Sequence, residues 1–288
     1  MIQARNKLSQ EELSEAKKLI NCCQAYDETY RDPYLSNMLN FDTNMPAFFL
    51  YYEKGELVGL LTVYADDPDV EVAILVHPNH RCQGIARALY RSFEKETASY
   101  PIESVTFQTE RIFLERHPDF ASNWGLVEDE ETETWLGKDR IPYPLANVSN
   151  LEVLLADRSY QDQISQLKFQ AFSEDHESRE VVDRYVAKAL KDPESLLYIL
   201  LKNGQVIGTC TVDLSSNTNY LFGLAIAELE RGKGYGTYLA KSLINQLIEQ
   251  NDKAFQIAVE DSNLGAKRLY EKIGFVKQTQ VVYLKPKV

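Results

Sequence analysis

The stretch RGKGYG, from Arg231 to Gly236, stands where a helical pattern begins, and it decides how the chain is interpreted. A glycine-rich turn at the start of a helix presents unpaired backbone N–H groups at the positive end of the helix dipole. Glycine tolerates a positive φ and lets a ligand approach the backbone closely. Arg231 and Lys233 add positive charge at the same place. The turn therefore predicts an anion site, and a diphosphate is its natural ligand.

A second copy of this arrangement occurs about 150 residues earlier as RCQGIA, Arg81 to Ala86. Each copy is preceded by two β-rich runs around a glycine turn, Phe48–Asp67 and Tyr198–Asn217, which predict hairpins. A further apolar run follows each hairpin, Val70–Val76 or Tyr220–Ile226. Features repeated in one order indicate two homologous domains.

The boundary between the domains is expected in the segment 137–150, which carries two prolines and no helical period. We therefore expect an N-terminal domain over 1–138, a linker over 139–150 and a C-terminal domain over 151–288.

The composition limits the classes of partner. A net charge of −12 argues against a broad nucleic-acid surface, because phosphate binding needs clustered Lys and Arg. The acidity either steers a cationic substrate or keeps the protein soluble. The four cysteines and four histidines show no metal-ligand spacing, and we expect no metal site. No signal peptide or bilayer-length apolar run is present, so we expect no membrane partner and a cytoplasmic location.

Known phosphate motifs narrow the choice of ligand. Neither turn contains the P-loop pattern, and Leu239 stands where a dinucleotide fingerprint needs its third small residue. Both turns fit R-x-x-G-x-[GA], and Asn263, Ala266 and Tyr270 fit N-x-x-A-x-x-x-Y further along. In these motifs the chain resembles the GNAT superfamily of N-acetyltransferases, whose turn holds the pyrophosphate of acetyl-CoA. The resemblance covers the C-terminal half fully and the N-terminal half more loosely.

The resemblance implies an α/β fold of two GNAT-like domains. Each would have a central, mostly antiparallel, twisted sheet with one splayed pair of parallel strands, flanked by helices. The pantetheine arm of acetyl-CoA would bond to the exposed strand edge in the gap. Gly223, just before that edge, would allow a bulge or a close approach, or would simply relieve crowding. The residues implied to bind the cofactor are Leu224, Ala225, Ile226, Arg231, Gly232, Lys233, Gly234, Tyr235, Gly236 and Asn263 in the C-terminal domain, and Ile74, Leu75, Val76, Arg81, Cys82, Gln83, Gly84, Ile85 and Ala86 in the N-terminal domain.

Tyr270 is the candidate general acid, because a phenol stays protonated at neutral pH and can donate to the departing thiolate. The alternative is a core aromatic, since Ala266, Tyr270 and Ile273 share one helical face. Asn263 also suits a helix N-cap, which is compatible with contacting the cofactor.

The catalytic parts are divided unevenly between the halves. Glu71 lies where many GNAT enzymes carry the general base, or else it is an exposed residue of an alternating strand. The N-terminal half has Ala121 in place of Tyr270, which indicates a degenerate copy. The C-terminal half has Tyr220 or Leu221 in place of Glu71, so its base would be Glu228, Glu230, Asp213 or bulk water.

The sequence thus predicts a tandem N-acetyltransferase that uses acetyl-CoA and an amine acceptor on a small molecule or peptide, with the C-terminal domain catalytic. Two alternatives stay open: a non-catalytic acyl-CoA-binding or regulatory protein, and a different donor such as succinyl-CoA, because the turn reads only the diphosphate. No motif identifies the acceptor.

Overall fold

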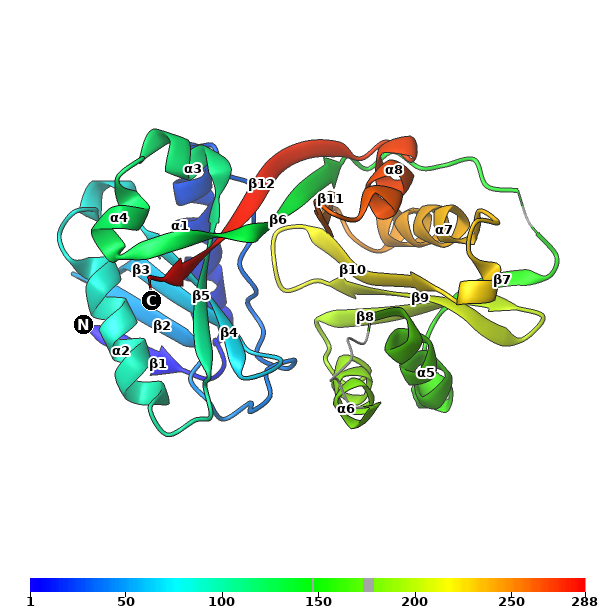
Figure 1. Cartoon of the computed structure of the whole chain (residues 1–288), viewed down its shortest axis with the longest axis horizontal. Coiled ribbons are helices and arrows are strands. Elements are labelled where there is room, and N and C mark those ends of the chain that lie inside the picture. Colours follow the sequence, from blue (N-terminus) through cyan, green and yellow to red (C-terminus); the bar gives the residue numbers. More distant parts are fainter. Residues whose placement is uncertain (147, 173–178, 288) are drawn as a thin grey trace. The chain divides into compact units, whose positions relative to one another are not determined.

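The computed structural model describes residues 1–146, 148–172 and 179–287. The chain divides into two compact units, each a mixed sheet flanked by helices (Figure 1). The N-terminal unit comprises Met1–Trp135 and Gln278–Val288, and the C-terminal unit comprises Leu136–Lys277. The predicted fold class, two α/β domains with mixed sheets, is confirmed.

Strands of the N-terminal unit follow the order β1-β2-β3-β4-β5-β12-β6. They are antiparallel to their neighbours from β1 to β4 and where β5 meets β12, whereas β4 and β5 are parallel. The elements are β1 (Ile2–Arg5), α1 (Gln10–Asp27), β2 (Phe48–Glu53), β3 (Glu56–Tyr64), β4 (Asp69–Val76), η1 (Pro78–His80), α2 (Ile85–Thr97), β5 (Ser104–Glu110), α3 (Arg111–Arg116), α4 (Phe120–Trp124), β6 (Leu126–Lys138) and β12 (Val276–Pro286).

Helices α1 and α2 cover opposite faces of this sheet. Phe48 and Phe49 are successive residues of β2, so their side chains point to opposite faces. Phe48 packs in one buried cluster with Ile20 of α1, and Phe49 packs in another with Phe93 of α2. The sheet is therefore buried on both sides at its centre.

The C-terminal unit repeats the plan with the strand order β6-β11-β10-β9-β8-β7. Here β10 and β11 are the parallel pair, and β7 to β10 are antiparallel. Helices α5 and α6 lie on one face of the sheet and α7 on the other (Figure 1). The elements are β7 (Leu151–Leu155), η2 (Arg158–Tyr160), α5 (Gln161–Phe172), α6 (Arg179–Ala189), β8 (Ser195–Lys202), β9 (Gln205–Asp213), β10 (Asn219–Ile226), η3 (Glu228–Glu230), α7 (Tyr235–Gln250), β11 (Phe255–Glu260) and α8 (Leu264–Lys272).

Both predicted hairpins are confirmed. Two-residue turns, Lys54-Gly55 and Asn203-Gly204, join β2 to β3 and β8 to β9. All four residues have positive φ, from 50° to 86°. Two residues at positive φ form the turn whose twist matches that of the flanking strands.

The units differ from the domain limits expected at 138 and 151. Residues 136–150 belong to the C-terminal unit, where Leu136 is fully buried in the core. Gln278–Val288 belong to the N-terminal unit, where Val282 and Leu284 of β12 are fully buried. The expected limits assumed that each repeat forms one domain. They did not place residues 278–288 in the N-terminal unit, because β12 pairs with β5 of the first repeat.

Among the described residues, no helix combines the length and apolar character needed to cross a bilayer. That same part of the chain holds no group of three or more His, Cys, Asp or Glu side chains able to hold a metal ion.

Candidate functional site

The glycine turn of the C-terminal unit joins η3 to α7 and leaves the helix start open. Gly234 is the N-cap of α7 at φ 85°, with no side chain capping the helix, and Gly232 has φ 76°. Tyr235 and Gly236 begin the helix. The free N–H groups at this end therefore face outward from a conformation that glycine adopts without strain.

Arg231 and Lys233 are held differently. The Arg231 Nε donates to the backbone oxygen of Ile226 at 3.0 Å, and its guanidinium forms no ion pair with any described residue. Lys233 is half exposed and pairs with Glu230 at 3.1 Å, which offsets part of its charge. Arg231 is thus the cation at this turn that keeps N–H groups without a carboxylate partner in the described chain.

The N-terminal turn has the same backbone and a different charge balance. Gly84 is the N-cap of α2 at φ 82°, and Cys82 has φ 59°. Arg81 Nε donates to the oxygen of Val76 at 3.0 Å, which matches Arg231. However, its two terminal nitrogens donate to both carboxylate oxygens of Asp27 at 2.7 and 2.6 Å. A second anion at this turn would share Arg81 with that carboxylate.

Each unit contains the predicted gap between parallel strands. Pairing of β4 with β5 ends at Val72, and pairing of β10 with β11 ends at Leu221. The expected cofactor edges, residues 74–76 and 224–226, lie beyond the last parallel pair of each ladder. Their backbone groups on that side are the ones an added extended ligand would use.

Strand β10 has a bulge beside its gap. Phe222 faces Thr211 and Ala225 faces Thr209, so Gly223 and Leu224 together oppose Cys210. Gly223 takes φ 58°, which favours glycine. The bulge expected from this glycine is confirmed, and it turns the local backbone groups out of the regular ladder.

A cavity of about 790 Å³ opens beside β4 in the N-terminal unit. It brings together every residue that was predicted to bind the cofactor in this half except Gln83. Those residues are Ile74, Leu75, Val76, Arg81, Cys82, Gly84, Ile85 and Ala86. Aromatic side chains of α3 and α4, Phe113, Phe120 and Trp124, line it as well. The exposed Gln83 donates its amide to the oxygen of Asn79 at 3.4 Å instead.

Glu71 lies on β4 close to this cavity. It accepts a hydrogen bond from Gln108, which lines the cavity. Burial raises the pKa of Glu71 to about 7, Arg31 lowers it, and nearby carboxylates, Glu133 first, raise it further. A carboxyl group with this pKa exchanges protons near neutrality.

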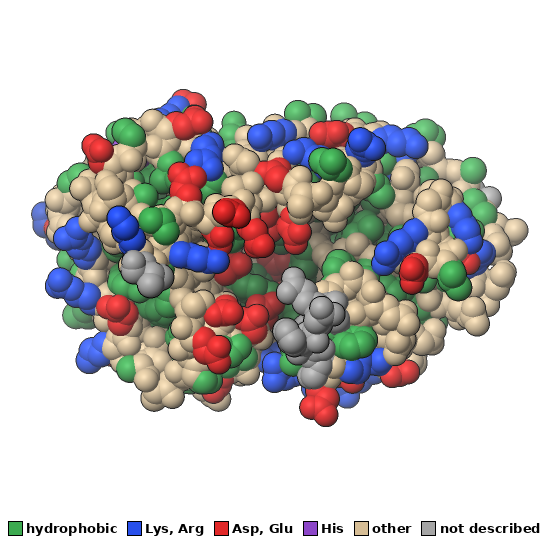
Figure 2. All heavy atoms as spheres, viewed as in Figure 1, with side chains coloured by type: hydrophobic (Ala, Val, Ile, Leu, Met, Phe, Trp, Pro, Cys, Tyr) green, Lys and Arg blue, Asp and Glu red, His purple; other side chains and the backbone are tan. Residues whose placement is uncertain are grey.

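Acidic side chains also gather on part of the face shown in Figure 2, consistent with the net charge of −12.

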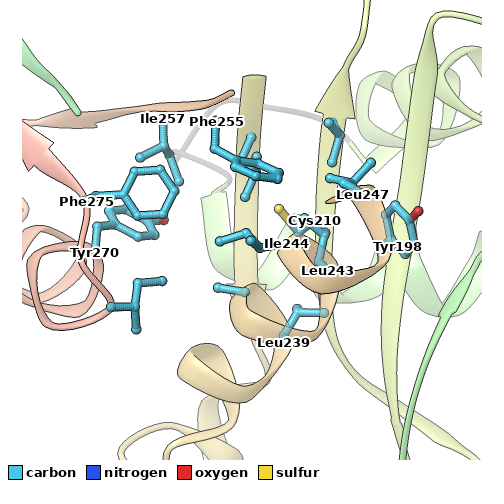
Figure 3. Close-up of a cluster of buried hydrophobic side chains, with 14 of the residues drawn as sticks. Tyr198, Cys210, Leu239, Leu243, Ile244, Leu247, Phe255, Ile257, Tyr270 and Phe275 are labelled. Atoms are coloured by element: carbon cyan, nitrogen blue, oxygen red, sulfur yellow. The ribbon is translucent and has the colours of Figure 1, made fainter. Parts of the chain in front are cut away.

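Tyr270 belongs to the core of the C-terminal unit. Its side chain is 6% exposed, and its ring lies 6.0 Å from that of Phe275 (Figure 3). Burial raises the pKa of the hydroxyl above its usual value, so the phenol is protonated at neutral pH. The hydroxyl makes no hydrogen bond to a described residue. The packed ring fits a structural role and the available O–H fits a proton donor, so the role of Tyr270 as general acid stays a prediction.

Asn263 is the N-cap of α8, where its side-chain oxygen accepts from the Ala266 N–H at 3.0 Å. The capping role is confirmed, and contact with a cofactor stays a prediction. Among the proposed bases, Glu230 is paired with Lys202 and Lys233, and Asp213 accepts from the backbone and hydroxyl of Ser215. Glu228 lies in η3 beside the turn.

Two residues near the sites were missed. Asp27 contacts Arg81 across 54 residues of sequence, and no local pattern signals that pairing. Lys168 is buried against the bulge of β10. A signal for it existed, because Ile164, Leu167 and Lys168 occupy one apolar face of α5, where a lysine is unusual.

Comparison with known proteins agrees with this geometry. The model of the Acetyltransferase (GNAT) family matches twice, at residues 13–121 and 161–275. The chain belongs to the GNAT family. Among curated relatives, a mycothiol acetyltransferase of Clavibacter sepedonicus is 25% identical over 230 residues, covering 76% of this chain and 73% of that protein.

Solved structures of GNAT proteins share the fold along the whole chain. A GCN5-related N-acetyltransferase from Sphaerobacter thermophilus superposes with a TM-score of 0.69 at 17% identity, covering 100% of this chain and 96% of that one. A tandem GNAT protein from the clavulanic acid biosynthesis pathway, solved without AcCoA, gives 0.70 at 15% identity, covering 99% and 97%. The tandem arrangement predicted from the sequence is confirmed.

Proposed function

We propose that this GNAT protein is an acetyl-CoA-dependent N-acetyltransferase, and that transfer takes place in the C-terminal unit. The bulge at Gly223, next to an unpaired strand edge and an open helix start, carries this proposal. Bound acetyl-CoA would supply the activated acetyl group. The N–H groups at the start of α7 and the Arg231 guanidinium would hold its diphosphate.

The residues of the C-terminal unit then have distinct tasks. The edge at residues 224–226 would align the pantetheine arm by backbone hydrogen bonds. Backbone N–H groups released by the bulge would stabilise the oxyanion that forms when the acceptor amine attacks. Tyr270 would donate its proton to the departing thiolate. The acceptor would be an amine on a small molecule or peptide, and the match to a mycothiol acetyltransferase supports acetyl transfer as the class of reaction.

A second candidate places catalysis in the N-terminal unit. The cavity beside β4 and the Glu71 carboxyl, with a pKa of about 7, favour it. Against it, β4 pairs with β3 in regular register from Glu71 to Val76, without a bulge, and Ala121 supplies no proton donor. In our proposal this unit binds CoA more weakly and does not turn it over.

Paired glycine variants test the assignment. Gly234→Val and Gly84→Val place a β-branched side chain at φ values of 85° and 82°, at the start of α7 and α2 respectively. Calorimetry of the wild type should show two CoA sites. Gly234→Val should remove the tighter site and abolish CoA release with an amine panel, and Gly84→Val should remove only the weaker site.

Other outcomes identify the alternatives. If turnover is lost in Gly84→Val and in Glu71→Gln but kept in Gly234→Val, catalysis takes place in the N-terminal unit. CoA binding without CoA release from acetyl-CoA or succinyl-CoA indicates a non-catalytic binding protein. CoA release from succinyl-CoA but not from acetyl-CoA means that the acyl donor differs from our proposal, while the proposed site stays the same.

A further inference from the structure

Lys168 of α5 places a buried amine against the bulge of the C-terminal unit. The residue is 5% exposed, and α5 packs on β9 and β10. Its Nζ lies 3.4 Å from the Thr211 hydroxyl. A Cβ atom built on Gly223 would lie 2.7 Å from the same nitrogen. The amine therefore occupies the space that a side chain at the bulge would need.

The side of the sheet on which Lys168 lies is set by β9. Cys210 belongs to the core that contains α7, and Thr211, the next residue, points to the opposite face. Lys168 contacts Thr211 and so approaches the bulge from the face covered by α5 and α6. The glycine turn leads into α7 on the other face. A ligand anchored at the turn and an amine on the α5 face would meet at the bulge.

The surroundings of Lys168 disfavour its charged form. Burial lowers its pKa to about 8. The rings of Phe172 on α5 and Tyr185 on α6 lie 5.9 and 5.5 Å from Nζ. The Cys210 thiol, on the other face of β9, interacts with Lys168 only electrostatically, and burial raises its own pKa to about 12. Strand β10 brings Gly223 close to the amine, and Phe222, which pairs with Thr211, has its side chain on the same face. No carboxylate of the described chain forms an ion pair with Lys168, so a large fraction is neutral near pH 8.

We propose that Lys168 is the general base of the C-terminal unit and accepts the proton of the incoming amine at the bulge. The inference rests on the proposed acetyl transfer in this unit. It supplies the group that is missing where Tyr220 takes the place of Glu71 on the corresponding strand.

The proton balance is simple. Neutral Lys168 Nζ removes one proton from the acceptor ammonium and becomes an ammonium itself. The freed amine forms the C–N bond with the thioester carbonyl carbon, and the C–S bond then breaks. The departing thiolate takes the proton of the Tyr270 hydroxyl. The newly bonded nitrogen, which is still positively charged, then gives one proton to the Tyr270 oxygen and becomes a neutral amide nitrogen. Lys168 finally releases its proton to solvent, so the products are an amide, a thiol and one proton.

Lys168→Met and Lys168→Arg test this step. Methionine keeps an unbranched apolar side chain in the buried site, and arginine keeps a charge that cannot be removed. Lys191→Met, at an exposed position before β8, is the matched control. Each variant is assayed for CoA release between pH 6 and 9.5 with two acceptors whose amine pKa values differ. Thermal unfolding verifies folding, and calorimetry gives CoA affinity.

We expect kcat to fall about 10²-fold or more in both Lys168 variants, with unchanged CoA affinity and a normal Lys191 control. The wild-type rate should fall as pH drops through about 8, because Lys168 becomes protonated, and this limb should stay fixed between acceptors and vanish in Lys168→Met.

Three results overturn the proposal. One is a folded Lys168→Met variant that keeps its rate and acid limb, and another is full activity in Lys168→Arg, which would show a need for charge alone. The third is mass-spectrometric detection of stoichiometric acetylation of Lys168, which would make it an acceptor. A wild type that releases no CoA with any amine overturns the proposed function itself and this inference with it, whereas turnover retained in Lys168→Met overturns this inference alone.

Discussion

The two units follow one path from hairpin to glycine turn, yet β10 is bulged where β4 is regular. The difference is one residue in the ladder, and it requires the positive φ of Gly223. In the N-terminal unit the corresponding stretch contains Ala73, which stays in register opposite Thr62. A shared fold therefore provides a gap in both sheets, and in our proposal the local irregularity is what lets one of the two gaps orient backbone N–H groups at a reacting carbonyl.

The arginines of the two turns also differ, because only one of them is paired with a carboxylate. Both donate Nε to the last carbonyl of the preceding strand, but both terminal nitrogens of Arg81 also donate to the Asp27 carboxylate. Arg231 forms no ion pair within the described chain. The N-terminal unit therefore has the cavity and a neutralised cation, whereas the C-terminal unit has a free cation and the bulge.

Gly223→Val should have the largest effect. Valine is strained at φ 58°, so the bulge loses its favoured backbone conformation, and its Cβ would lie 2.7 Å from Lys168 Nζ, so the lysine amine must move away. We expect turnover to fall by more than about 10²-fold and the unfolding free energy by about 1–3 kcal/mol. Kinetics and denaturant titration measure the two.

The control for that variant is Gly204→Val, at φ 80° in a hairpin turn with open space around it. It should share the stability loss and keep normal turnover per folded molecule. Equal turnover losses in both variants would mean that the bulge has no special part in catalysis.

Tyr270→Phe should reduce kcat about 10²-fold without changing CoA affinity, because the ring still packs on Phe275 while the proton donor is gone. Since burial raises the phenol pKa, the wild type should lose no activity through Tyr270 up to pH 9.5. Tyr198→Phe is the matched control, because Tyr198 belongs to the same core (Figure 3) and its hydroxyl accepts a hydrogen bond from Gln250. It should lose about 1 kcal/mol of stability and no turnover. The reverse pattern would make Tyr270 a packing residue only.

Asp27→Asn should have the smallest effect, and it should increase CoA affinity where the other variants reduce activity. Removing the carboxylate frees Arg81, so CoA affinity of the N-terminal unit should rise about 3–10-fold while the unit loses stability. The measurement is calorimetry in a Gly234→Val background, which leaves one site. Unchanged or weaker binding would show that the arginines do not explain the difference between the turns.

Much of this site follows from local sequence. Glycines at fixed spacing set both turns, Lys54-Gly55 and Asn203-Gly204 set both hairpins, and Gly223 signalled the bulge. These are short-range consequences of backbone conformation, so one sequence suffices to predict them. The pairing of Asp27 with Arg81 joins residues 54 positions apart, and it depends on where α1 ends relative to the turn.

The place of β12 was beyond local sequence as well. Strands β6 and β12 occupy equivalent places in the two repeats, and each follows a short helix. Nothing in the alternation of either strand indicates that β12 pairs with β5. Val282 and Leu284 of β12 are buried in the N-terminal core, whereas β6 contributes Leu126 to that core and Leu136 to the C-terminal core.

The pairing of β12 with β5 also imposes an order on folding during synthesis. Strand β5 is made long before β12, so the N-terminal core stays incomplete until residues 278–286 have left the ribosome. By then the whole C-terminal unit has emerged and can fold. Until that moment β5 has an exposed edge, which invites pairing with other chains. The first half of this protein is therefore the last to complete its core.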